Sequence, residues 1–142
     1  MPSYDASTSI AASGESVWRV LAEVAAWPEW LPTVESVQPL DGNPLSVGFR
    51  YIVRQPKLRP ATWIVTELEP PRRFVWEARS PGLLMVAEHT IEERSPGSSN
   101  VNLRFSFTGV LGPLIGRLFR SVTQQYLAQE AASLRLKVEG QQ

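Results

Sequence analysis

His89 is the only histidine of the chain and the first candidate for a chemical role. It follows the same alternation as Met85, Ala87 and Ile91, so its side chain is expected to face the interior of the fold. An imidazole in that place can orient the carbonyl or hydroxyl of a ligand, or move a proton near neutral pH. The alternative is a hydrogen-bonded core histidine without a ligand role. Tyr51 is the second candidate for a catalytic group, and no other is predicted.

Carboxylates that could work with His89 are absent from its own side of the strand. Glu88 and Glu92 fall on the opposite face, which makes a histidine–glutamate pair within one strand unfavourable. Glu67 shares a face with Trp63, but a buried carboxylate needs a partner, so we expect Glu67 at a solvated strand end. The residues of the strands therefore predict no acid–base pair.

Composition excludes several classes of protein. The 142 residues include no cysteine and one histidine, which rules out cysteine-ligated zinc and multi-histidine metal centres, so no metal or cofactor is predicted. Fourteen basic residues balance fourteen acidic ones, and a nucleic-acid partner usually demands a basic excess. No G-x-S-x-G motif or phosphate-binding glycine loop is present.

The elements that must position these groups follow from the sequence periodicity. A short strand is expected over 4–10, followed by a helix capped by Ser13. A second short helix should begin at Pro28 and end before Pro32. Five further strands then show alternating apolar positions, over 47–54, 63–68, 73–78, 85–92 and 101–108.

The C-terminal part predicts one long helix over about 114–138, with an apolar stripe along one side and polar residues, Glu130 among them, on the rest of its surface. Strands joined by short turns pair antiparallel, and their apolar face needs a cover, which this helix supplies. We therefore predict a single α+β domain over 1–142, an antiparallel sheet of six to seven strands wrapped around a long C-terminal helix. A strongly twisted sheet leaves a gap beneath such a helix.

Large side chains on the inward faces are the candidates to line that gap. Aromatic residues in these positions are ordinary core taken singly, but together they suit a pocket for an apolar ligand. The predicted ligand-binding residues are Phe49, Tyr51, Trp63, Trp76, Met85, His89, Phe105, Phe119, Val122 and Tyr126.

An ordered set of short motifs resembles a known family. The set runs from Ser13-x-x-x-Val17-Trp18 through Trp27-Pro28-Glu29-Trp30 and 67–76 to Glu88-His89-x-Ile91 and the terminal helix. It resembles the SRPBCC superfamily of START-like proteins, in particular the polyketide cyclase/dehydrase and lipid-transport-like group. The resemblance covers nearly the whole chain and implies a helix-grip fold with a deep hydrophobic cavity. It says little about chemistry, since relatives include cyclases, carriers and receptors.

Three functions remain open from the sequence. The first is binding of a hydrophobic small molecule, such as a lipid, isoprenoid or polyketide-like compound, in the internal cavity. The second is a cyclase or dehydratase acting in the same cavity. The third is an interaction module that uses the apolar, glycine-rich connection over 109–115 to touch a partner or, transiently, a membrane.

Targeting signals are not expected in this sequence. Residues 1–12 have neither the basic nor the apolar region of a signal peptide, and the longest uncharged run, 105–116, is shorter than a bilayer-spanning helix. We expect a cytoplasmic protein without a transmembrane segment. The oligomeric state is unknown from sequence.

Overall fold

The computed structural model describes residues 2–42 and 44–140 and has one antiparallel sheet with helices on one side. The seven strands are β1 (Ser3–Ile10), β2 (Ser36–Pro39), β3 (Arg50–Arg54), β4 (Ala61–Glu69), β5 (Arg73–Ser80), β6 (Leu83–Ser95) and β7 (Ser98–Thr108). The helical segments are α1 (Gly14–Ala22), a 3-10 helix η1 (Val24–Glu29), α2 (Gly112–Leu118) and α3 (Arg120–Glu139).

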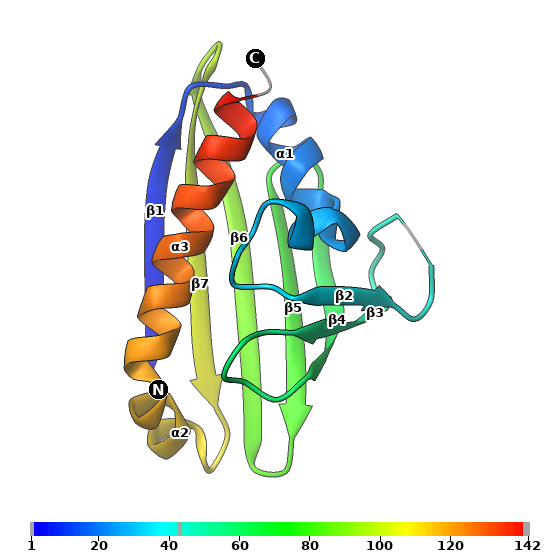
Figure 1. The fold of residues 1–142 in the computed structure, drawn as a ribbon, viewed down its shortest axis with the longest axis vertical. Helices are drawn as coiled ribbons and strands as arrows, with labels where there is room; N and C mark the ends of the chain where they lie inside the picture. The colour runs from blue at the N-terminus through cyan, green and yellow to red at the C-terminus, as the bar shows by residue number, and fades with distance from the viewer. Residues whose placement is uncertain (1, 43, 141–142) are drawn as a thin grey trace.

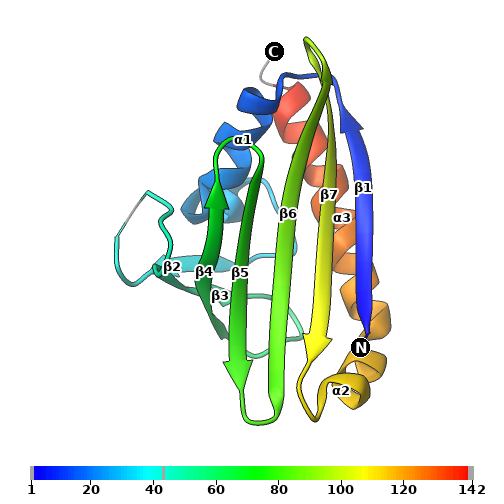
Figure 2. The ribbon, with the colours of Figure 1, turned by 180° about the vertical axis from the view of Figure 1, so that it is seen from behind.

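The sheet order is β1-β7-β6-β5-β4-β3-β2, with every neighbouring pair antiparallel. In Figure 1, α3 lies across one face of this sheet, with α1 near its C-terminal end. Figure 2 shows the opposite face from behind, with no described helix over it. The predicted α+β helix-grip architecture is confirmed. The core lies between the sheet and the helices, where Tyr51, Phe74, Leu103 and Leu134 are fully buried.

Local signals account for the start of α1 and for the last hairpin. Ser13 caps α1 as predicted, because its hydroxyl accepts a hydrogen bond from the Ser16 amide at 3.2 Å. The turn-rich segment expected over 95–100 is shorter than predicted, since β6 and β7 extend to Ser95 and Ser98. Gly97 has a φ of 80°, a conformation that glycine adopts readily in a tight hairpin turn.

The second short helix begins earlier than the sequence predicts. It is the 3-10 helix Val24–Glu29, and Pro28 lies inside it. The amides of Ala26 and Trp30 donate to the carbonyls three residues earlier, so these bonds do not require an N–H at Pro28. The indole of Trp27 is buried and donates to the Leu21 carbonyl at 3.0 Å, which anchors the segment in the core.

The first part of the strand expected over 47–54 is a turn. Gly48 has a φ of 87°, and the Phe49 amide donates to the Ser46 carbonyl, so β3 starts only at Arg50. The edge strand β2 was not predicted, because four residues ending in a proline carry little periodicity.

The long helix expected over 114–138 is divided at Phe119. The hydrogen bonds Phe119 to Ile115 and Thr123 to Phe119 continue across the junction, which makes it a bend. The hydroxyl of Tyr4 on β1 donates to the Gly116 carbonyl at 2.9 Å and holds α2 against the sheet. The two helical pieces therefore follow different parts of the curved sheet.

Candidate functional site

A cavity of about 510 Å³ lies between the concave face of the sheet and the helices α2 and α3. Strands β3 to β7 supply one wall, and the two helices supply the other. Most of the lining is apolar, including Trp27, Leu58, Ala87, Leu103, Phe107, Ile115 and Leu127. A space of this size and character suits a small apolar molecule.

All but two of the predicted ligand-binding residues line this cavity. They come from four strands, from α3 and from the junction between α2 and α3, and the structure brings them together as the alternation and the apolar stripe predict. The cavity-lining members are Trp63, Trp76, Met85, His89, Phe105, Phe119, Val122 and Tyr126.

Phe49 and Tyr51 are the exceptions. Phe49 precedes β3 in the turn beside Gly48 and packs against the edge of the core, so it does not reach the cavity. Tyr51 is completely buried behind Trp76, at a ring-centroid distance of 5.9 Å. Its hydroxyl has no hydrogen-bond partner among the described residues, and burial raises its pKa. Tyr51 is therefore a core residue outside the cavity lining.

His89 faces the interior from β6, as its alternation predicts. It is buried in an aromatic cage, with the Phe74 ring 4.0 Å away and Trp27 and Trp76 at 5.8 and 6.0 Å between ring centroids. Its Nδ1 lies 3.3 Å from the Phe74 carbonyl oxygen. Because a carbonyl only accepts, Nδ1 carries the proton in the neutral ring, which leaves Nε2 as an acceptor.

Glu130 of α3 is the carboxylate that sequence reasoning missed. Its Oε2 lies 3.7 Å from Nε2 of His89, and only 15% of its side chain is exposed. That oxygen is buried and has no hydrogen bond within the described residues. A signal did exist, since Glu130 is three residues after Leu127 and four before Leu134, both buried on the inward stripe of α3.

Burial moves the pKa values of the two groups in opposite directions. It lowers the pKa of His89 to about 3, with a smaller lowering from the charge of Arg73 and an opposing effect of the Phe74 carbonyl. It raises the pKa of Glu130 to about 7. Near neutral pH the imidazole is neutral, and the carboxyl group holds its proton in a large share of molecules.

The pair therefore presents a donor beside an acceptor. Protonated Glu130 offers an O–H, and Nε2 of His89 offers a lone pair. Their separation of 3.7 Å is longer than a direct hydrogen bond. Both residues line the cavity, so an oxygen of a ligand can approach the pair only from the cavity side, as a hydroxyl that accepts from Glu130 and donates to His89, or as a carbonyl that accepts from Glu130.

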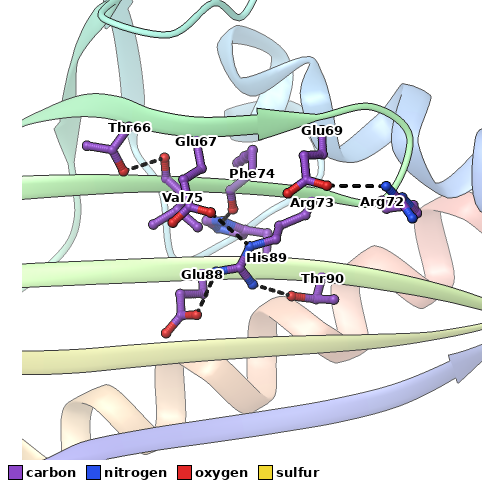
Figure 3. Close-up of polar contacts among 10 residues, drawn as sticks. All are labelled: Thr66, Glu67, Glu69, Arg72, Arg73, Phe74, Val75, Glu88, His89 and Thr90. Atoms are coloured by element: carbon purple, nitrogen blue, oxygen red, sulfur yellow. Dashed lines mark hydrogen bonds and ion pairs between the residues drawn. The ribbon is translucent and has the colours of Figure 1, made fainter.

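Arg73 of β5 forms a hydrogen-bond network with side chains of the neighbouring strands close to His89, as Figure 3 shows. Its guanidinium donates to Glu88 at 3.0 Å, to Thr90 at 3.1 Å and to Glu67 at 3.4 Å. Glu67 is exposed, as predicted. This network joins β4, β5 and β6 and satisfies Glu88, so Glu88 does not serve as the partner of His89.

One end of the cavity is bordered by the connection between β3 and β4. Lys57 and Arg59 of this connection line the cavity and are exposed. The Tyr126 hydroxyl of α3 donates a hydrogen bond to the Pro56 carbonyl and ties the connection to the helix. Burial raises the pKa of Tyr126, so this hydroxyl keeps its proton at neutral pH.

The described residues contain no group of three histidine, cysteine or acidic side chains placed to hold a metal ion. Over the same residues, no helix has the length and apolar character needed to cross a bilayer.

Three solved structures have the same fold at low sequence identity. An aromatase/cyclase, ZhuI, from a Streptomyces species is 18% identical over 96% of this chain and 93% of that chain, with a TM-score of 0.78. A START superfamily protein from Mycobacterium smegmatis is 18% identical over 100% of both chains, with a TM-score of 0.71.

The third, the di-domain aromatase/cyclase BexL, is 21% identical with a TM-score of 0.73. The match covers 98% of this chain but 47% of BexL, so the chain spans about half the length of that protein. No curated protein sequence matches the chain. The predicted resemblance to START-like proteins is confirmed by these folds and by a family model that matches residues 1–139, and the chain belongs to the family described as polyketide cyclase/dehydrase and lipid transport.

Proposed function

We propose that the protein binds an uncharged, largely apolar small molecule in the cavity, with one hydroxyl or carbonyl oxygen placed against the cavity side of His89 and Glu130. The observation that carries the proposal is an apolar cavity of about 510 Å³ that contains this buried donor–acceptor pair. Lipids, isoprenoids and polyketide-like compounds all combine a large apolar surface with such an oxygen.

The chemistry of the wall supports an uncharged ligand. Burial of apolar ligand surface stabilises the complex by about 25 cal/mol per Å², before the costs of association are subtracted. Glu88 and Arg104 border the cavity too, but their side chains pair with Arg73 and Asp5. The buried part of the wall thus offers an anionic ligand no free cation among the described residues.

Native mass spectrometry of the freshly purified protein, followed by organic extraction, tests occupancy directly. A stoichiometric apolar adduct is the expected result, and its mass gives the chemical class. The uncharged dye Nile red provides a second test by fluorescence titration. Val122→Trp narrows the cavity and should weaken dye binding, whereas Leu136→Trp on an exposed part of the same helix should not. Equal dye binding by both variants contradicts the proposed site.

The polar pair is tested with two ligands that differ by one hydroxyl group. 2-Naphthol should bind about tenfold more tightly than naphthalene, the ratio expected from one additional hydrogen bond. Glu130→Leu should remove this preference and leave naphthalene binding in place. A preference that survives in Glu130→Leu contradicts the role of the pair in recognition.

A second candidate function, an enzyme of the cyclase or dehydratase type, is favoured by the same pair. A neutral acid and a neutral base 3.7 Å apart can act on one ketone, where Glu130 donates its proton to the carbonyl oxygen and His89 removes a proton from the adjacent carbon. The product of this step is an enol. Conversion of a poly-ketone substrate should disappear in Glu130→Gln and His89→Gln and persist in Tyr51→Phe, since Tyr51 lies outside the cavity lining.

A further inference from the structure

Four large apolar side chains are exposed together at one end of the molecule. Val110 is 90% exposed, Leu114 64% and Leu118 71%, and Leu111 lies between them in sequence with a lower exposure. We call Val110, Leu111, Leu114 and Leu118 the apolar end. Single exposed apolar residues are ordinary, but four within nine positions form a patch that indicates an interaction surface.

The fold holds this end in a defined shape. The Leu111 amide donates to the Gly82 carbonyl at 2.8 Å, which joins the start of α2 to the turn between β5 and β6. Figure 1 shows α2 and this turn at the same end of the molecule. Tyr4 bonds to the carbonyl of Gly116, so α2 is anchored from its other side. The apolar end is therefore a preformed surface.

The other side of α2 belongs to the cavity. Ile115 and Phe119 line the cavity, whereas Leu114 and Leu118 face outward. The apolar end and the cavity are thus the two sides of one short helical segment. Whatever covers the apolar end lies next to the cavity wall.

The charges around the apolar end are positive. Arg117 and Arg120 lie in the same helical turns, are exposed, and have no ion-pair partner among the described residues. The sequence has no aspartate or glutamate between Glu93 and Glu130. Arg79, near the end of β5 and next to the turn, forms an ion pair with Glu77 at 3.1 Å. Lys57 and Arg59 add two positive charges at the cavity.

We propose that the apolar end is a docking surface for an anionic lipid bilayer. Its four side chains enter the apolar layer, and Arg117 and Arg120 meet the negatively charged headgroups. This combination of exposed aliphatic residues with flanking cations fits the interface of an anionic membrane, which supplies both an apolar layer and negative charge. Docking places the α2 wall of the cavity at the membrane, which would allow direct ligand exchange if the proposed cavity function holds. The docking itself does not depend on that function.

The test is co-sedimentation of the full chain with vesicles. Vesicles of phosphatidylcholine with phosphatidylglycerol should bind the protein, and vesicles of phosphatidylcholine alone should bind it weakly. Leu114→Asp/Leu118→Asp should lower the affinity about tenfold or more, because two leucines no longer enter the apolar layer. Arg117→Gln and Arg120→Gln should each lower it about fivefold, and only for the anionic vesicles.

Val47→Asp/Leu136→Asp is the matched control, since both residues are exposed and lie on other segments. It should bind like the unmodified protein, and all variants should keep the same melting temperature. Failure of the unmodified protein to bind anionic vesicles overturns the proposal, as does an equal loss in the control. Self-association without vesicles that disappears in Leu114→Asp/Leu118→Asp would assign the surface to a second copy of the chain and also overturn it.

Discussion

Nε2 of His89 on β6 and Oε2 of Glu130 on α3 face each other across 3.7 Å in the buried part of the cavity. Neither group reaches the other by a direct hydrogen bond. Burial lowers the pKa of His89 to about 3 and raises that of Glu130 to about 7, so the pair favours two neutral groups over an ion pair. This relationship gives the cavity its hydrogen-bonding chemistry and has consequences for stability.

The two groups make opposite contributions to the pH dependence of folding. The pKa of Glu130 rises from 4.5 in the unfolded chain to about 7, so the stability it contributes is full below pH 4.5 and is lost as the pH rises to 7. The pKa of His89 falls from 6.5 to about 3, so its contribution increases between pH 3 and 6.5. Between pH 4.5 and 6.5 the two effects offset each other.

In Glu130→Gln the pH dependence of stability that His89 contributes should therefore no longer be offset. Relative to the unmodified protein, its free energy of unfolding should increase from pH 4.5 to 7, by on the order of 3 kcal/mol. Relative to the unmodified protein, His89→Gln should lose stability as the pH rises from 3 to 6.5, because it lacks the increase that His89 contributes over that range. Urea denaturation at a series of pH values measures both, and the double variant is the control. A difference between Glu130→Gln and the unmodified protein that does not change with pH contradicts the raised pKa of Glu130.

Tyr126→Phe tests the connection between α3 and the loop that borders the cavity. Removal of the hydroxyl releases the Pro56 carbonyl and should cost about 1 kcal/mol of stability. The local effect should be larger, since residues 55–60 lose their tie to the helix. Hydrogen exchange should accelerate in 55–60 and stay unchanged in β6 and β7. Uniform acceleration over the whole chain would instead indicate a global loss of stability.

Gly116→Ala tests the close approach of α2 to the rest of the fold. A Cβ at this position would lie 2.6 Å from Cβ of Pro2 and 3.2 Å from Cβ of Phe107. Crowding of this kind should destabilise the protein by about 1–3 kcal/mol, measured by thermal or urea unfolding. Gly14→Ala is the matched control in a helix, because its added Cβ would have ordinary contacts of 3.6 Å or more. Equal effects of the two substitutions would show that crowding at Gly116 is not the cause.

Elements with strong periodicity were predicted from the sequence. The strands β4 to β7 and the inward orientation of His89 follow from alternation, which depends only on neighbouring residues. The cap at Ser13 likewise needs only local hydrogen bonds. The prediction was wrong where a contact between residues distant in sequence determines the local structure. Such contacts accompany the bend at Phe119 and the early start of η1 around buried Trp27.

The candidate site shows the same division. Trp63, Phe105 and Val122 were predicted to line the cavity from periodicity alone, because an apolar side chain on an inward face lies either in the core or at the cavity wall. Tyr51 follows the same pattern but lies in the core behind Trp76, since β3 is near the β2 end of the sheet, whereas α3 packs mainly on β1 and β7 at the other end. Alternation identifies the face of the sheet on which a side chain lies, but it does not determine whether that side chain lines the cavity or lies in the core.

By itself, the sequence determined the fold class, the inward face of each main strand and the apolar character of the interior, because these depend on patterns a few residues long. Only the tertiary structure decided that Glu130 meets His89. A carboxylate on a helix is ordinarily expected in solvent, and its burial results from the way α3 packs across the sheet and brings a glutamate to the one imidazole of β6. The pKa shifts of both groups follow from that packing, since it removes them from water.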